Sequence, residues 1–339
     1  MRLVGITVVV VLVAFAGAAP AQARPRDAIP VIYDSDMDFD DASTLAYLCE
    51  EHKLGRIDLR AVTVAEDGFG VPSRTLRHAH SVLAQCGLPG VPIAAGAAGE
   101  GVHPAPAELV ATIETVLSGA LGDGDLPPVV SELTATELIA RTARRSPVTI
   151  LATGPLTNVA AALADPRTSR RITKVQLMGG ALHVPGNLYG SALPGYDNSQ
   201  EFNMWMDPAS ARDVLRRAAI RMVPLDATAA VPITQDYIAR IGADQQAPGA
   251  RIVHRIATQP DLAALIDLGI MYWWDALAAV SLAHDDVTTF RPSRIDVVQE
   301  GVQSGRTVVT PHGYPVRAAQ EADRAAFEQR FLDSLNGRR

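Results

Sequence analysis

The chain has 339 residues and carries 30 basic against 37 acidic side chains, a formal net charge of −7. An acidic surface argues against nucleic acid as a partner, because binding to phosphates needs clustered lysine and arginine. The length is large for one domain but is compatible with a single α/β domain.

Residues 1–23 have the pattern of a secretory signal peptide. Arg2 precedes an apolar run over 3–19, and the small-x-small sequence Ala-Gln-Ala ends at Ala23. The alternative is an uncleaved membrane anchor, for which the apolar run is short. We therefore expect a secreted or periplasmic protein with no membrane association after cleavage. Its mature chain, 24–339, keeps 29 basic and 37 acidic side chains and forms one domain.

Short apolar strands alternate with helical patterns along the mature chain. Strands are expected at 31–33, 59–64, 91–94, 148–152, 175–178 and 222–225, and helices at 41–52, 72–86, 134–144, 156–164, 208–218 and 274–284. This alternation predicts an α/β fold with a mixed, mainly parallel sheet that is covered on both faces. The functional crevice of such a sheet lies beyond the carboxyl ends of its strands.

The first strand is followed by five aspartates within eight residues, in the stretch "VIYDSDMDFDDASTL". These are Asp34, Asp36, Asp38, Asp40 and Asp41. Carboxylates at such spacing raise one another's pKa unless a cation or a set of donors compensates their charge. Calcium takes six to eight oxygen ligands and suits this composition. A bound divalent ion lowers the pKa of water, and an aspartate can accept the proton that the water loses.

Oxygen-bearing side chains also follow the later strands. They are Asp67 in "AEDG", Thr153 and Asn158 in "TGPLTN", Asn187 in "PGN", Glu201 and Asn203 in "EFN", Asp226 in "PLDAT" and Asp275 in "WWDALAA". Amides and carboxylates pair well with the hydroxyls of a polyol. The rim of the sheet therefore indicates a metal and sugar site.

Structural roles compete with this interpretation at several positions. Asp40 and Asp41 precede a helix and could serve only as caps, and Asp275 also begins a helix. Asp207 is followed by proline, which indicates a plain helix cap. Asn158 could simply stabilise a turn. Five aspartates in eight residues nevertheless exceed what capping requires.

Two known acidic motifs do not fit the first stretch. An EF-hand loop that began at Asp34 would need glycine and glutamate where Phe39 and Leu45 stand. A phosphatase of the haloacid-dehalogenase type would need a suitably placed lysine, and the only lysines are Lys53 and Lys174. A metal-dependent phosphohydrolase therefore stays a weak alternative.

The spacing D-x-D-x-x-x-D-D at 34–41 resembles the signature of the inosine-uridine-preferring nucleoside hydrolases. Matches to "TGPLTN", "MGG", "PGN", "EFN", "PLDAT" and "WD" follow in the order of that family and span nearly the whole mature chain. The resemblance implies a single catalytic domain with a Rossmann-like fold, commonly assembled as a homodimer or homotetramer. It implies hydrolysis of the N-glycosidic bond of ribonucleosides with a calcium cofactor.

The same resemblance implies the roles of individual residues. Asp36, Asp41, Asp275 and the backbone carbonyl of Thr153 would hold Ca²⁺, and Asp36 would also deprotonate the attacking water. Asp34 would support these ligands. Asp40 and Asn203 would bind the ribose hydroxyls, and Asn187 and Glu201 would bind the 5′-hydroxyl end.

Three departures from the family pattern affect these expectations. Met37 and Asp38 replace Pro-Gly; we expect Asp38 to tolerate a left-handed backbone there, and its carboxylate to affect metal affinity. Asp67 stands near an expected asparagine, and no role is assigned to it. Trp274 replaces the histidine of the inosine-uridine-preferring members, which favours purine nucleosides because tryptophan stacks on the base.

Trp273, Trp274 and Tyr272 could together form an aromatic wall, although core packing explains such a cluster equally well. Cys49 and Cys86 are the only cysteines, and either a disulfide or two buried thiols fits an exported chain.

We therefore expect an exported, calcium-dependent nucleosidase with a purine preference. The alternatives are a secreted nucleoside- or sugar-binding protein of the same fold without turnover, and the phosphohydrolase.

Overall fold

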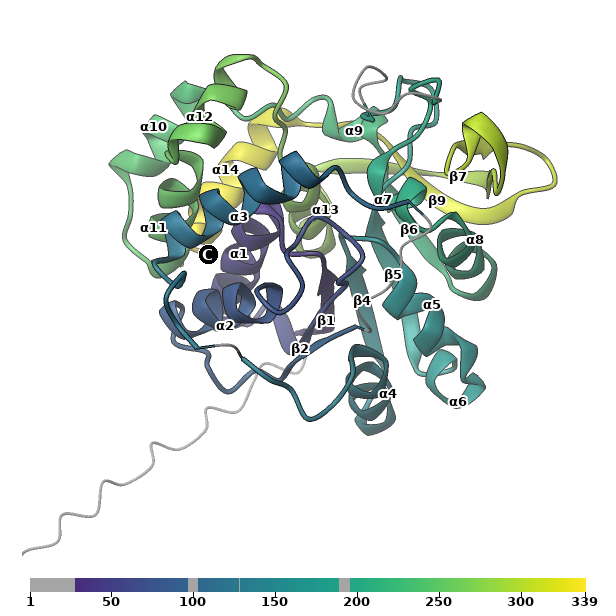
Figure 1. Ribbon diagram of the computed structural model, residues 1–339, viewed down its shortest axis with the longest axis horizontal. Coiled ribbons are helices and arrows are strands. Elements are labelled where there is room, and N and C mark those ends of the chain that lie inside the picture. Colours follow the sequence, from purple (N-terminus) through teal and green to yellow (C-terminus); the bar gives the residue numbers. More distant parts are fainter. Residues whose placement is uncertain (1–27, 97–102, 128, 189–195) are drawn as a thin grey trace, which may run out of the picture.

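A nine-stranded sheet forms the centre of the molecule (Figure 1), and its strand order is β3-β2-β1-β4-β5-β6-β9-β7-β8. The computed structural model describes residues 28–96, 103–127, 129–188 and 196–339, so the predicted signal peptide lies outside the described residues. The strands are β1 (Ile29–Ser35), β2 (Ile57–Val64), β3 (Ile93–Ala95), β4 (Val148–Ala152), β5 (Ile172–Met178), β6 (Ile220–Val223), β7 (Thr288–Val297), β8 (Thr307–Val309) and β9 (Tyr314–Ala322).

The sheet is mixed and mainly parallel, as predicted. Every pairing from β3 across to β9 is parallel, whereas β7 runs antiparallel to both β9 and β8. The chain runs from β1 outward to β2 and β3 and then returns to β4 on the other side of β1. The connections therefore leave in opposite directions at β1 and β4, which creates a crevice at the carboxyl ends of these two strands.

Helices cover both faces of the sheet (Figure 1). One layer contains α1 (Phe39–Leu54), α2 (Thr75–Gln85), α3 (Ala107–Leu121), α10 (Gln235–Ala243), α11 (Pro248–Ala257), α12 (Pro260–Asp267), α13 (Trp274–Ala283) and α14 (Arg324–Leu335). The other contains α4 (Ala135–Arg145), α5 (Thr157–Ala164), α6 (Pro166–Ser169) and α8 (Pro208–Arg217). The short helices α7 (Phe202–Met206), α9 (Leu225–Thr228) and η1 (Gly301–Gln303) lie in the connections.

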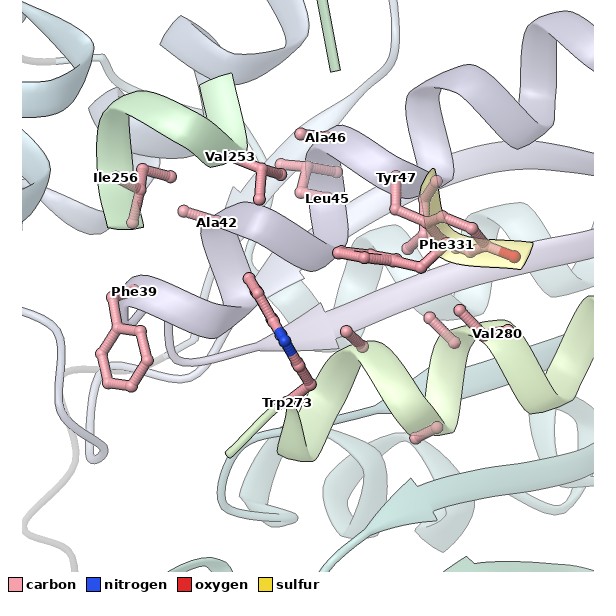
Figure 2. Close-up of a cluster of buried hydrophobic side chains, with 14 of the residues drawn as sticks. Phe39, Ala42, Leu45, Ala46, Tyr47, Val253, Ile256, Trp273, Val280 and Phe331 are labelled. Atoms are coloured by element: carbon pink, nitrogen blue, oxygen red, sulfur yellow. The ribbon is translucent and has the colours of Figure 1, made fainter. Parts of the chain in front are cut away.

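Helix α1 is the centre of the larger apolar core (Figure 2), where its side chains meet α11, α13 and α14. Trp273 is 1% exposed, and its ring centroid lies 5.2 Å from that of Phe331. Trp273 therefore belongs to this core and not to an aromatic wall. Of the two interpretations of the cluster at 272–274, core packing is the correct one for this residue.

The six strands and six helices expected from the sequence are present, with ends that shift by a few residues. The elements that were not expected are α3, α6, α7, α9 to α12, α14, η1 and the strands β7 to β9. Strands β7 and β9 carry arginines and prolines on exposed positions, so they lack the continuous apolar run that marks a strand buried on both faces.

Cys49 and Cys86 are buried free thiols, which decides between the two alternatives left by the sequence. Burial and the neighbouring Cys86 raise the pKa of the Cys49 thiol well above its ordinary value. In the described part of the chain, no helix is both long and apolar enough to cross a membrane.

A buried charge network ties α3 to α2. The Nδ1 atom of His78 lies 2.9 Å from a carboxylate oxygen of Asp123, and its Nε2 atom lies 3.0 Å from a carboxylate oxygen of Glu114. The imidazole of His78 therefore lies between two carboxylates at the base of α3.

We predict that Asp123→Asn lowers the free energy of unfolding by about 3 kcal/mol at pH 7, because it removes the more deeply buried of the two carboxylates that His78 contacts. Burial raises the pKa of Asp123, but hydrogen bonds and charge from His78 outweigh this, so the pKa is lowered. A lowered pKa stabilises the fold above about pH 4 and loses this effect as the pH falls further. Urea unfolding at pH 7 and pH 3 should therefore show a smaller difference at pH 3.

The matched control is Asp125→Asn, which changes an exposed aspartate two residues away. Equal stability of the Asp123 and Asp125 variants at pH 7 would contradict the prediction.

Candidate active site

The candidate site lies at the carboxyl ends of β1 and β4. Asp34 pairs in register with Ala152, and the amide of Thr153 donates to the carbonyl of Asp34 over 2.9 Å. The loops that follow the two strands therefore start side by side. This places Asp36 next to Thr153, although the two lie more than a hundred residues apart in sequence.

A tight turn connects β1 to α1. Met37 has φ 56°, so the left-handed residue is Met37 and not Asp38, which has φ −80°. Asp38 is the helix cap: its carboxylate accepts from the amides of Asp40 and Asp41 over 2.9 and 3.1 Å. The carboxylate of Asp41 accepts from the amide of Asp38 in return over 3.1 Å. Capping by Asp38 leaves the side chain of Asp40 available for the site.

Asp36 is held from the loop after β2. Its Oδ2 atom accepts from the amide of Phe69 over 2.6 Å. A Cβ atom added to Gly68 would lie 2.1 Å from the same oxygen, and one added to Gly154 would lie 2.7 Å from the Asp36 amide nitrogen. Both neighbours must therefore be glycine for Asp36 to sit where it does.

Asp40 connects the first turns of α1 and α13, because its Oδ2 atom accepts from the amide of Asp275 over 3.1 Å. Asp275 is 4% exposed, and its carboxylate receives no hydrogen bond from the described residues. One carboxylate oxygen each of Asp38, Asp40 and Asp275 lies within 4.8 Å of the others. Asp207, by contrast, is a plain cap of α8 with Pro208 at the first position, as predicted.

Burial and mutual repulsion raise the pKa of the clustered carboxyls. Burial is the larger cause for Asp36, Asp40 and Asp275, and the charges of neighbouring aspartates add to it. The pKa of Asp38 is raised to about 6 by the same causes. Among the described residues, no lysine, arginine or histidine lines the cavity to offset this charge.

This oxygen-only donor set fits a calcium ion, which prefers carboxylates and carbonyls. Asp36, Asp40, Thr153 and Asp275 line the cavity, whereas Asp41 lies behind them and contacts Tyr33 and the Thr153 hydroxyl. The side-chain amide of Asn203 donates to the Thr153 carbonyl over 2.7 Å.

Asn187 and Glu201 line the same polar end of the cavity. The Glu201 carboxylate accepts from the amides of Gly180, Asn203 and Met204 over 2.9, 2.9 and 3.1 Å, and so caps α7. Burial raises its pKa, although these three amides act in the opposite direction.

The opposite end of the cavity is apolar and comes from helices. Leu109, Ile113 and Val116 form a stripe along α3, and Leu262 and Leu265 face it from α12. This wall was not predicted from the sequence, because neither helix was expected. The pattern that indicates α3 is the i, i+4, i+7 spacing of its three apolar residues.

Aromatic rings complete the apolar end. Trp274 lines the cavity, and its ring lies 6.4 Å from Phe39 at an interplanar angle of 62°. Phe69 and Phe202 also line it, and their rings pack edge to face at 4.8 Å. Tyr272 contacts Trp274 but does not line the cavity.

Asp34 lies beneath the cavity and is fully buried. The Asn158 amide donates to it over 3.0 Å, and the Thr63 hydroxyl donates to the same oxygen, so Asn158 does more than stabilise a turn. Burial raises the pKa of Asp34 to about 7. Asp67 binds the Thr157 hydroxyl and does not line the cavity.

The sequence profile of the family described as inosine-uridine preferring nucleoside hydrolase matches residues 31–329. The chain belongs to this family. Nucleoside hydrolase folds are also found among solved structures: that of the inosine-uridine preferring nucleoside hydrolase from Bacillus anthracis superimposes with a TM-score of 0.78. The superposition covers 91% of this chain and 99% of that one at 22% identity, which shows the shared fold.

Curated relatives of this chain include two proteins named pyrimidine-specific ribonucleoside hydrolase RihA. The protein from Citrobacter koseri is 34% identical over 59% of this chain, and the match spans 61% of that relative's length. The protein from Shewanella woodyi is 32% identical over 90% of this chain and 97% of its own length.

Proposed function

We propose that this chain is an exported, calcium-dependent ribonucleoside hydrolase that releases a free base and ribose. The observation that carries the proposal is one cavity with two chemically distinct ends. Carboxylates and amides at the polar end suit the hydroxyls of ribose, and aromatic and aliphatic side chains at the other end suit a flat base. Membership of the nucleoside hydrolase family supports the same reaction.

Different polar residues bind different hydroxyls of ribose. In this proposal Asp40 and Asn203 bind the hydroxyls nearest the carboxylate cluster, and Asn187 and Glu201 bind the 5′-hydroxyl end. The backbone contacts of Asp40 and Glu201 fix their carboxylates before any substrate arrives. Such preorganisation lowers the entropy that binding must remove.

Cleavage of the N-glycosidic bond builds positive charge on the ribose ring. The buried carboxylates stabilise this charge as it develops, so their binding energy contributes to rate. Held by Asp36, Asp41, Asp275 and the Thr153 carbonyl, a calcium ion would lower the pKa of the attacking water. Asp36 accepts a proton from that water, and the oxygen of the water bonds to C1′. The base leaves with the electrons of the glycosidic bond.

Preference for purine nucleosides is the finer part of the proposal and rests on Trp274. Its indole lines the apolar end, where a larger base would offer more area for stacking. The two curated relatives carry pyrimidine-specific names, so a preference for uridine and cytidine is the competing outcome.

Two alternatives use the same cavity differently. A binding protein without turnover would need the ribose contacts but not a proton acceptor beside a cation. A phosphohydrolase would need positive charge for a phosphate, and no basic side chain among the described residues lines the cavity. The composition of the cavity therefore favours hydrolysis of nucleosides.

The first experiment measures ribose released from inosine, adenosine, guanosine, uridine and cytidine by the mature chain, with calcium and after chelation. We expect calcium-dependent release, and a loss of at least about 100-fold in kcat for Asp36→Asn, because a positioned proton acceptor contributes at least that much. Asp67→Asn is the matched control, since Asp67 is buried nearby but does not line the cavity. Nucleoside binding without ribose release by the wild type would favour the binding protein.

Trp274→Leu tests the base preference. We expect the purine-to-pyrimidine ratio of kcat/KM to fall by about tenfold, because stacking of one base on an aromatic ring is worth about 1–3 kcal/mol. Tyr272→Leu is the control variant, because Tyr272 contacts the indole of Trp274 but does not line the cavity. It distinguishes stacking of Trp274 on the base from packing that supports the indole. An unchanged ratio for Trp274→Leu, or a wild type that prefers pyrimidines, would refute the role of Trp274.

Export is supported by the apolar run and cleavage pattern of residues 1–23. We expect N-terminal sequencing of the protein recovered outside the cytoplasm to begin at Arg24. Recovery of the intact chain in the cytoplasm would refute export and would leave the proposed reaction unaffected.

A further inference from the structure

Tyr33 is a fully buried tyrosine directly before the aspartate cluster. It lies in β1, whose side chains alternate between the two faces of the sheet. Val31 and Tyr33 join the core around α1, whereas Ile32 joins the core on the opposite face. The side chain of Tyr33 therefore lies beneath the first turn of α1, which contains Asp41.

The Tyr33 hydroxyl donates to Oδ1 of Asp41 over 2.7 Å. The Thr153 hydroxyl lies 2.5 Å from the same Oδ1 atom and 3.0 Å from the Tyr33 oxygen. Each hydroxyl has one proton to donate, and both reach Oδ1, whose two lone pairs are thereby used. The other oxygen, Oδ2, accepts from the amide of Asp38 over 3.1 Å, which uses one of its two lone pairs.

We propose that Tyr33 is a positioning residue of the cation site, which fixes the Asp41 carboxylate so that Oδ2 is presented to calcium. This role rests on the calcium site of the proposed function. Tyr33 immediately precedes the aspartate motif at 34–41 and is not part of it. Groups that orient a ligating carboxylate typically change metal affinity by 10- to 100-fold when they are removed.

The Tyr33 hydroxyl is the donor in its contact with Asp41, because a carboxylate oxygen accepts. A hydroxyl that serves only packing would show no preference for a carboxylate in the site, so the choice of Asp41 as acceptor is the informative contact.

The chain supplies a matched control in Tyr237. It is 1% exposed and does not line the cavity, and its hydroxyl donates over 2.7 Å to the carbonyl of Glu328. Tyr237→Phe therefore removes one hydrogen-bonded phenolic hydroxyl from the core, as Tyr33→Phe does. Any difference in calcium binding between the two variants then arises from Asp41.

The test is isothermal titration of calcium into the metal-free wild type, Tyr33→Phe and Tyr237→Phe, with thermal unfolding of each. We expect the dissociation constant for calcium to rise by at least tenfold in Tyr33→Phe and to stay within twofold in Tyr237→Phe. The calcium concentration for half-maximal ribose release should shift in parallel, whereas kcat at saturating calcium should stay within about threefold.

A dissociation constant for Tyr33→Phe within twofold of the wild type would overturn the proposal. If Tyr33→Phe does not fold, Thr153→Val and Thr153→Ser replace it: weaker calcium binding by the valine variant alone supports the hydroxyl pair, and equal binding refutes it. A wild type that binds no calcium would overturn both the cation and this role. Calcium binding without ribose release would overturn the reaction alone.

Discussion

Repulsion among buried carboxylates is the constraint that shapes this molecule. Six aspartates are packed around the ends of two strands: Asp34, Asp36, Asp38, Asp40, Asp41 and Asp275. Four of them, Asp36, Asp38, Asp40 and Asp275, line the cavity, and no basic side chain among the described residues lines it. Carboxylates in such surroundings are stable only if amides, hydroxyls, protons or a cation balance their charge. Most features near the site supply one of these. Asp38 collects two helix amides, Asp36 collects one, and Asp34 collects a hydroxyl and a side-chain amide.

The topology of the sheet makes this crowding possible. Because the connections diverge at β1 and β4, their carboxyl ends leave an open crevice between two adjacent loops. The hydrogen bond that the amide of Asp275 donates to the Asp40 carboxylate then connects that crevice to α13, a helix that begins more than two hundred residues later in the sequence. Two distant segments are thus held at one point by a backbone contact that needs no substrate or ion.

The polar end of the cavity could be predicted from the sequence, and the apolar end could not. Asp36, Asn187 and Glu201 follow apolar strands, and the position after a strand in a parallel sheet specifies where a side chain goes. Leu109 and Ile113 look like any core residue, because nothing in their composition distinguishes a cavity wall from a packed interface. The backbone of Met37 was also missed, since a left-handed methionine has no local signal and is imposed by its neighbours.

The two ends of the cavity belong to different parts of the architecture. Strand ends and helix starts form the polar end, and residues on α3 and α12 form one wall of the other. Substitutions along the α3 stripe can therefore reshape the apolar wall without changing a single carboxylate contact. Specificity for the leaving base can therefore change during evolution through substitutions in the apolar wall alone, while the arrangement of carboxylates at the polar end is conserved.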